Sequence, residues 1–302
     1  MFLVDPKEIS VARLHGYILS SVAPRPIALA STISSDGQIN LSPFSFFNAF
    51  GANPPILIFS PARRVRDNTT KHTLENIKET KEVVINVVSH SMVHQQSLAS
   101  TEYEKGVNEF VKSGFTAIAS EKVKPFRVKE SPVQFECVVK QIIETGTEGG
   151  AGNLIICEIV LMHIDESILN DKQTIDQQKI DLVSRLGEDW YCRASGDSLF
   201  RVAKPMSGKG GIGFDQLPDE IKNSRLLTGN ELGQLANIER IPDTEEIKKF
   251  IESEEYKKII SASPIKLTNK QDDIHIKAKL LLAKGQVDAA WKYLLADKML
   301  QS

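Results

Sequence analysis

The stretch that decides the fold is RPIALASTISSDGQINLSPFSFFNAF, residues 25–50. It begins with a run rich in β-forming residues and then reaches Ser35-Asp36-Gly37-Gln38, a sequence typical of a tight turn. Asp-Gly between two such runs is a hairpin signal, because glycine accepts the positive φ that these turns require. The stretch therefore predicts a strand, a tight turn and a second strand.

Similar signals continue outward from this hairpin. PPILIFSP (54–61) predicts another strand, and TKHTLENIKET (70–80) predicts a short helix that leads into a buried strand at VVINVV (83–88). Two stretches with period-two alternation flank the glycine-rich GTEGGAGN (146–153) and predict a long antiparallel hairpin. Five or six strands with only short helices between them indicate a mainly β chain that closes into a barrel. A Rossmann fold is not favoured, since no glycine motif follows a strand and opens a helix.

The character of the sequence changes after about residue 205. KPMSGKGGIGFDQLP (204–218) has the composition of a linker or surface loop, and helical spacing replaces the strand signals in 242–260 and 276–300. Asp243 or Thr244 is expected to cap the first helical segment, and Gly285 to separate two arms of a helical hairpin. We therefore predict one domain at 1–205, followed by a linker and a C-terminal α-helical extension at 206–302. A single hairpin like one tetratricopeptide unit cannot form a solenoid, so a small helical cap is the expectation.

Composition narrows the possible functions. The 302 residues carry a formal net charge of −2 with both signs mixed along the chain, which argues against nucleic acid and membrane partners. The amino terminus lacks the pattern of a signal peptide, so a cytoplasmic protein is expected. Three separated cysteines without metal-type spacing suggest reduced thiols, and the six histidines form no zinc motif. Difficult chemistry would therefore need an organic cofactor.

At residues 25–50 the sequence resembles the flavin reductase-like family of FMN-binding split barrels. The resemblance runs in order over roughly residues 10–205. Further matches are Arg63-Arg64, residues 68–77, the strand 83–88 with Asn86, residues 108–110, Glu130-Ser131-Pro132 before Glu136-Cys137, and Arg185-Leu186-Gly187 with Tyr191. The resemblance implies an FMN-binding split β-barrel with short helices. It says nothing about residues 206–302.

The resemblance also implies where the flavin lies. The segment expected along the isoalloxazine alternates aromatic with small polar residues: Ser42, Pro43, Phe44, Ser45, Phe46, Phe47 and Asn48. Taken alone, its phenylalanines could simply fill the barrel core. The candidates for the phosphate end are Ser31, Thr32, Lys71 and Thr73, because hydroxyls and an ammonium group can satisfy a dianion.

Two arginines and three departures from the family pattern leave alternatives open. One departure is Cys157, at a strand position where relatives often have glycine, and it could change only the barrel packing. Arg25 and Arg64 could add positive charge at the flavin, or could be solvated surface residues. His72 stands where the family often has aspartate, and Glu188 follows Gly187 where a second glycine is common. The glutamate leaves the substrate preference open.

The implied reaction is hydride transfer from NADH or NADPH to bound FMN, followed by transfer of reducing equivalents to a flavin, a metal centre or another small-molecule acceptor. We name no catalytic side chain and no metal ligand, because the cofactor carries this chemistry. The alternatives are a non-enzymatic FMN electron carrier and a binding module without cofactor. A homodimer with flavin sites near its interface is expected, because a small barrel has no internal room for a flavin.

Overall fold

The computed structural model describes residues 1–202, 204, 210–261 and 270–301. The chain forms two compact units, Met1–Phe200 and Arg201–Ser302. The domain boundary predicted at 205/206 lies outside the described residues. Each unit has hydrophobic clusters of its own.

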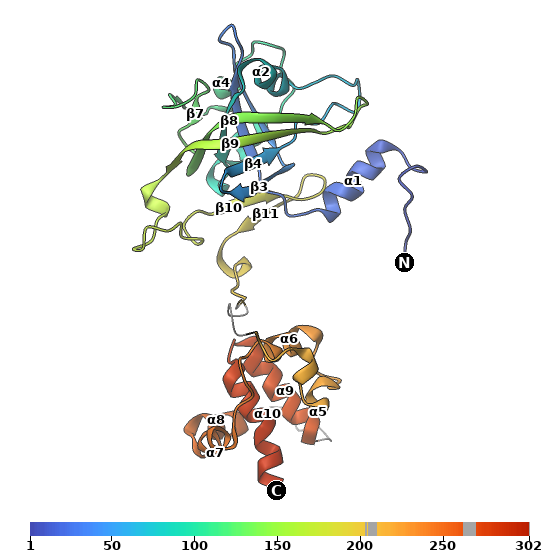
Figure 1. The fold of residues 1–302 in the computed structure, drawn as a ribbon, viewed down its shortest axis with the longest axis vertical. Helices are drawn as coiled ribbons and strands as arrows, with labels where there is room; N and C mark the ends of the chain where they lie inside the picture. Colours follow the sequence, from blue (N-terminus) through green and yellow to red (C-terminus); the bar gives the residue numbers. More distant parts are fainter. Residues whose placement is uncertain (203, 205–209, 262–269, 302) are drawn as a thin grey trace. The chain divides into compact units, whose positions relative to one another are not determined.

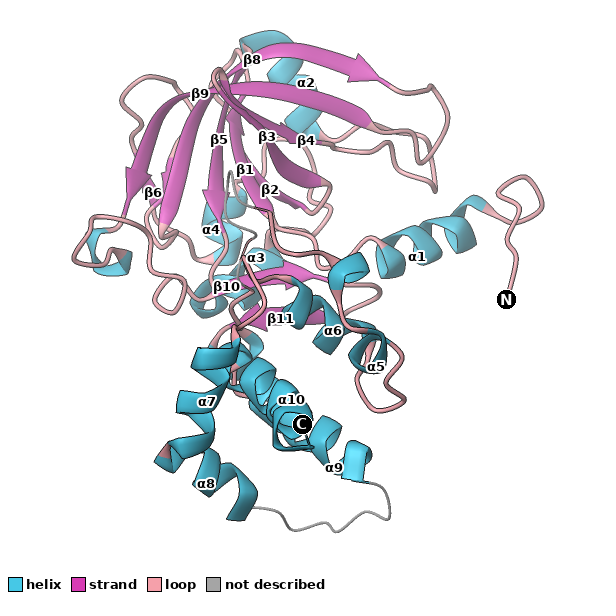
Figure 2. Cartoon of the chain, turned by 60° about the horizontal axis from the view of Figure 1, so that its bottom comes forward, coloured by secondary structure: helices cyan, strands magenta, loops and turns pink. Residues whose placement is uncertain are grey.

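The first unit is built on a seven-stranded antiparallel sheet in the order β2-β1-β5-β8-β9-β4-β3. Figure 1 labels four of its strands, β8, β9, β4 and β3. Its strands are β1 (Ala28–Ile33), β2 (Ile39–Phe44), β3 (Phe47–Ala52), β4 (Pro55–Phe59), β5 (Glu82–Val87), β8 (Val133–Glu144) and β9 (Asn153–Ile164). The two edge strands, β2 and β3, are consecutive in the chain and only Ser45 and Phe46 separate them. The sheet must therefore curve until its edges meet at this corner, which makes it a split barrel (Figure 2).

The local sequence signals explain these strands. Gly37 in the β1–β2 turn has a φ of 86°, the positive value that the Asp-Gly pair predicts. The glycine-rich loop joins β8 and β9, whose register runs from Val133↔Ile164 to Glu144↔Asn153. Inward-facing apolar side chains from six strands and α2 fill the barrel, so the predicted β core is confirmed.

The remaining elements of the first unit are short helices and short hairpins. The helices are α1 (Val11–Ser21), α2 (His72–Thr80), η1 (His90–Met92), α3 (Val93–Leu98), α4 (Glu109–Ser113), η2 (Glu166–Ile168) and η3 (Gly196–Ser198). Two further hairpins are β6–β7 (Ala117–Ile118, Arg127–Val128) and β10–β11 (Leu182–Arg185, Tyr191–Ala194). The predicted helix at 70–80 is α2, and it packs on β1 and β2.

The second unit is helical, as its sequence predicts. It contains η4 (Phe214–Gln216), α5 (Asp219–Lys222), α6 (Gly229–Ala236), α7 (Thr244–Glu252), α8 (Glu254–Ser261), α9 (Lys270–Ala283) and α10 (Val287–Gln301). Asp243 caps α7, and Gly285, with a φ of 73°, lies between α9 and α10. The expected helix over 242–260 is divided at Ser253, whose backbone is extended. Among the described residues, no helix has the length and apolar character that crossing a bilayer requires.

Candidate functional site

The first unit holds a cavity of about 710 Å³ between three elements that are distant in sequence. Pockets for cofactors and small molecules generally fall between about 300 and 1,000 Å³. Its walls come from the start of β1 and the end of β2 (Ile27, Pro43, Ser45), from η1, α3 and the turn after it (His90, His94, Gln96, Ser97, Ser100), and from the β10–β11 hairpin (Val183, Arg185, Tyr191, Cys192, Arg193). Apolar and polar side chains alternate around it, so it can hold a ring system with polar edges.

The β10–β11 hairpin is fastened to the barrel by backbone pairing at both ends. Leu182 pairs with Ser89, and Arg185 pairs with Arg25 just before β1. The guanidinium of Arg185 lies 4.7 Å from the ring centroid of Tyr191, at a distance typical of a cation–π contact. This hairpin therefore forms one fixed wall of the cavity.

Arg25 is buried and is not a solvated surface residue. Its guanidinium donates to the carbonyls of Leu19, Val22 (2.8 Å) and Leu186 (2.7 Å), and its Nε donates to Ser45 Oγ (3.3 Å). Burial, together with the nearby Arg185, lowers its pKa. Arg25 thus joins α1, the β2–β3 corner and the β10–β11 turn, and protein carbonyls occupy most of its donors.

A second, smaller hollow lies next to the cavity. Ser100 contributes to both, and the adjacent β2 residues Ser42 and Pro43 line the smaller and the larger one respectively. The smaller hollow is lined by polar and charged side chains that include Ser42, Arg64, Lys71, His72, Thr73 and Glu102. Two of the residues predicted for the phosphate end, Lys71 and Thr73, therefore lie together with Arg64 beside the predicted ring segment.

Arg64, Arg66 and Lys71 converge on the carboxylate of Glu102. Arg64 Nε lies 3.0 Å and Lys71 Nζ 3.5 Å from Glu102 Oε1, and Arg66 donates to Oε2 at 2.9 Å. Partial burial raises the pKa of Glu102, but the hydrogen bonds from both arginines outweigh this, so its pKa lies below the ordinary value. Burial, reinforced by Arg64, lowers the pKa of Lys71. Arg64 is also not a freely solvated residue.

The loop that carries these cations is shaped by its own hydrogen bonds. Arg64 donates from NH1 to Thr69 Oγ1 at 2.8 Å, and Arg63 donates to Asn68 Oδ1 at 2.6 Å. The β8–β9 loop supports it from one side, with backbone hydrogen bonds of 3.0 Å from Gly150 N to Arg63 O and of 2.9 Å from Arg63 N to Ala151 O. Two loops distant in sequence thus hold the cluster in place.

Buried hydroxyls lie close to the smaller hollow. Asn40 Nδ2 donates to Thr73 Oγ1 at 2.9 Å, and Asn76 Nδ2 donates to Thr32 Oγ1 at 3.1 Å. Ser31 and Thr32 are fully buried in β1 and are not among the residues that line either hollow. Ser31 Oγ is a buried hydroxyl with no hydrogen-bond partner among the described residues.

The aromatic segment divides between core and site. Phe44 is buried in the barrel core, and its ring centroid lies 5.5 Å from that of Phe59. For this residue the structure therefore agrees with the alternative that the phenylalanines fill the core. Phe47 packs against the same core, and Phe46 contacts His15 of α1 edge-on. Asn48 is exposed, and its Oδ1 accepts a hydrogen bond from the amide of Ala49. Ser42, Pro43 and Ser45 are the members of this segment that line the hollows.

Sequence reasoning missed the wall formed by residues 90–102. His90, His94 and Gln96 line the larger cavity. Gln96 is only 3% exposed, and within the part of the chain that the structure describes its Oε1 has no hydrogen-bond partner. Its only sequence signal is a cluster of His, Gln and Ser directly after a buried strand. Tyr191, by contrast, was within the quoted family pattern.

Glu109 anchors this region from another side. Its buried carboxylate accepts a 3.0 Å hydrogen bond from the Leu41 amide of β2, which ties α4 to the strand that carries the site. Burial raises the pKa of Glu109 above its ordinary value. It belongs to the 108–110 motif, for which the sequence suggested no role.

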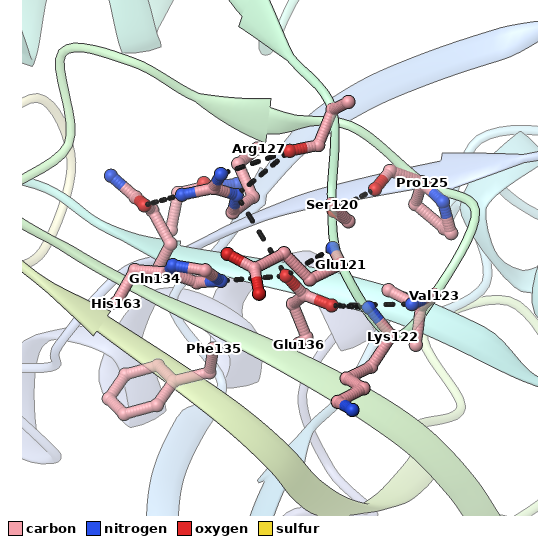
Figure 3. Close-up of polar contacts among 12 residues, drawn as sticks. Ser120, Glu121, Lys122, Val123, Pro125, Arg127, Gln134, Phe135, Glu136 and His163 are labelled. Atoms are coloured by element: carbon pink, nitrogen blue, oxygen red, sulfur yellow. Dashed lines mark hydrogen bonds and ion pairs between the residues drawn. The ribbon is translucent and has the colours of Figure 1, made fainter.

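A second buried carboxylate lies away from the cavity, and its contacts are structural (Figure 3). Glu136 of β8 is fully buried and accepts hydrogen bonds from the amides of Glu121 (2.9 Å), Lys122 (2.6 Å) and Val123 (3.2 Å), and from His163 Nε2 (2.7 Å). Burial raises its pKa, but these hydrogen bonds outweigh the effect and the pKa is lowered overall. Glu136 therefore fastens the β6–β7 loop to the barrel.

Comparison with known proteins gives one matching family. Residues 20–179 match the model of the flavin reductase like domain. An uncharacterized protein of Aquifex aeolicus is 36% identical over 196 residues, which cover 65% of this chain and 97% of the relative.

Two solved structures are similar. Nitrilotriacetate monooxygenase component B from Bacillus cereus aligns with a TM-score of 0.62 and 27% identity, over 67% of this chain and 98% of its own. The 2-nitrobenzoate 2-nitroreductase NbaA of Pseudomonas fluorescens aligns with a TM-score of 0.60 and 26% identity, over 68% of this chain and 100% of its own. About a third of this chain lies outside each match.

Proposed function

The chain belongs to the flavin reductase like domain family, and from that premise we propose that it binds FMN, accepts hydride from NADH or NADPH, and passes reducing equivalents to a flavin or another small-molecule acceptor. Family membership supports a flavin-related oxidoreductase. The cofactor, the donor and the acceptor are the proposed part. The similar solved structures include both a monooxygenase component and a nitroreductase, which supports a flavin as well as another small molecule as the proposed acceptor.

The observation that carries the proposal is the pairing of the two hollows. FMN has a broad ring system at one end and a phosphate dianion at the other, and these need different surroundings. The larger cavity offers mixed apolar and polar walls, and the adjacent hollow offers Arg64, Lys71 and the hydroxyls of Ser42 and Thr73. The unpartnered Gln96 Oε1 in the larger cavity can accept a hydrogen bond from a ligand.

Each group of residues has a definite task in this proposal. Lys71 and Arg64 bind the phosphate through charge-assisted hydrogen bonds. Pro43 and Ser45 position the ring, and Arg25 holds Ser45 in place from the buried side. Tyr191 and Arg185 form the facing wall and limit access of water. When bound, FMN supplies the redox chemistry, so no side chain has to act as acid, base or nucleophile.

Anaerobic stopped-flow absorbance tests this function. The FMN-loaded protein is mixed separately with NADH and NADPH, and rapid bleaching of the flavin band by either is the expected result. Reduction only by a partner protein would instead identify an electron carrier. A purified protein that neither contains nor binds FMN would reject both and favour a binding module without cofactor.

We also propose that the functional unit is a homodimer. α1 buries none of its residues in the single chain, and it exposes Val11 and Ile18, with the exposed Val22 directly after it. Exposed apolar side chains of this kind mark association surfaces. Light scattering at micromolar concentration is expected to give the mass of a dimer. Ile18→Asp should shift it to the monomer, while Arg13→Ala on the same helix should not.

A further inference from the structure

Glu102 occupies an unusual position, because its one carboxylate contacts Arg64 and Lys71, the two cations proposed to bind the phosphate, and also Arg66. Both of its oxygens are engaged, Oε1 by Arg64 and Lys71 and Oε2 by Arg66. The donors come from the 61–71 loop, whereas Glu102 comes from the segment between α3 and α4. The same donor groups that would bind a phosphate are thus held together by an anion of the protein itself.

Glu102 is more exposed than the two cations that share its Oε1. Its side chain is 41% exposed, whereas those of Arg64 and Lys71 are 15% and 27% exposed. A carboxylate at this depth regains most of its hydration when it rotates outward, and exposed ion pairs of this kind contribute little to folding. Arg64 keeps its position without Glu102, because it is also held by Thr69 Oγ1 at 2.8 Å and by Thr70 O at 2.5 Å.

We propose that Glu102 is a displaceable counter-ion of the phosphate-binding cations. It pairs with Arg64 and Lys71 while FMN is absent and gives up these contacts when the phosphate ester enters. This inference rests on the proposed binding of FMN at the same site.

Charge explains the direction of the exchange. A phosphate monoester carries about −1.5 to −2 at neutral pH, more than a carboxylate, so it competes successfully for the same donors. The two anions repel each other at short distance and cannot share the cluster equally. Displacing Glu102 costs free energy, which lowers the affinity for FMN and makes it an exchanging ligand.

The test is fluorescence titration of Glu102→Gln with FMN and with riboflavin, which lacks the phosphate. Glutamine keeps the size of the side chain but competes only weakly, so FMN should bind about fivefold more tightly, the upper range for loss of an exposed ion pair. Riboflavin affinity should not change. Glu102→Asp, which keeps the charge, should bind FMN like the unaltered protein, and so should Glu104→Gln, an exposed carboxylate of the same segment.

Weaker or unchanged FMN binding by Glu102→Gln would overturn the proposal, because it would mean that the carboxylate orients the cations or has no influence. Calorimetric titration with inorganic phosphate separates this failure from failure of the proposed function. If no variant binds FMN but Glu102→Gln binds phosphate more tightly than the unaltered protein, the counter-ion is supported and FMN is rejected. Equal phosphate binding by both proteins would overturn the counter-ion.

Discussion

Lys71 presents an ammonium group to the smaller hollow and makes no contact that the barrel core depends on. Lys71→Ala should weaken FMN binding tenfold or more, since a charge-assisted hydrogen bond contributes about 1.5–3 kcal/mol. The stability of the fold should change little. Flavin fluorescence titration measures the first effect and urea unfolding the second. Lys78→Ala is the matched control, because Lys78 lies on α2, the helix that begins directly after Lys71, but pairs with Glu144. Equal losses of FMN affinity in both variants would remove Lys71 from the site.

Glu136 gives a prediction about stability and pH. Its lowered pKa means that the carboxylate stabilises the fold fully above about pH 4.3, the pKa of a glutamate in unfolded chains, and that this contribution is lost as pH falls toward the folded pKa. Glu136→Gln should therefore cost about 3 kcal/mol at pH 7, because it breaks a buried charge cluster, and clearly less near pH 3.5. Urea unfolding at both pH values checks this. Glu158→Gln, which breaks only the exposed pair with Lys140, should cost less than about 1 kcal/mol at either pH.

At the scale of elements, the β8–β9 loop shapes the site without touching a ligand. A Cβ on Gly149 would lie 3.0 Å from Val65 O and 3.1 Å from Arg64 O, too close for the basic loop to keep its position. Gly149→Ala should therefore weaken FMN binding severalfold although no charge changes. Gly146→Ala is the control, since its Cβ would meet only Ala151 Cβ at 3.4 Å. Fluorescence titration with FMN measures the affinity of both variants. Equal affinities would show that the β8–β9 loop and the 61–71 loop move independently.

At the scale of the whole molecule, the two units should unfold separately. The core around Trp291 uses residues of the second unit alone, and the barrel clusters use residues of the first. A chain ending at Phe200 should therefore fold and bind FMN. The full chain should show two unfolding transitions, and the blue-shifted emission of the fully buried Trp291 should follow only the helical one. Trp190 is 70% exposed and contributes a red-shifted background. An insoluble truncation and a single joint transition would make the units interdependent.

The sequence by itself determined the turns, helix ends and strands whose formation depends on neighbouring residues. Asp36-Gly37 fixes a turn because its conformation depends on neighbouring residues only, and Asp243 and Gly285 mark helix ends for the same reason. The period-two runs predicted the strands, and the ordered motif pattern predicted the split barrel and placed Lys71 and Thr73 together at one site.

Only the tertiary structure decided which side chains face the site. Nothing in the sequence distinguishes Arg25 from a surface arginine. The fold buries it, and its guanidinium donates hydrogen bonds to the backbone carbonyls of Val22 and Leu186. Gln96 and Glu102 belong to no sequence motif. They reach the site because α3 and the segment after it pass beside β2 and the 61–71 loop. Phe44 turns into the core while Pro43 and Ser45 line the cavity, because successive residues of a strand point to opposite faces. Such choices depend on contacts between residues tens of positions apart, and local sequence does not contain them.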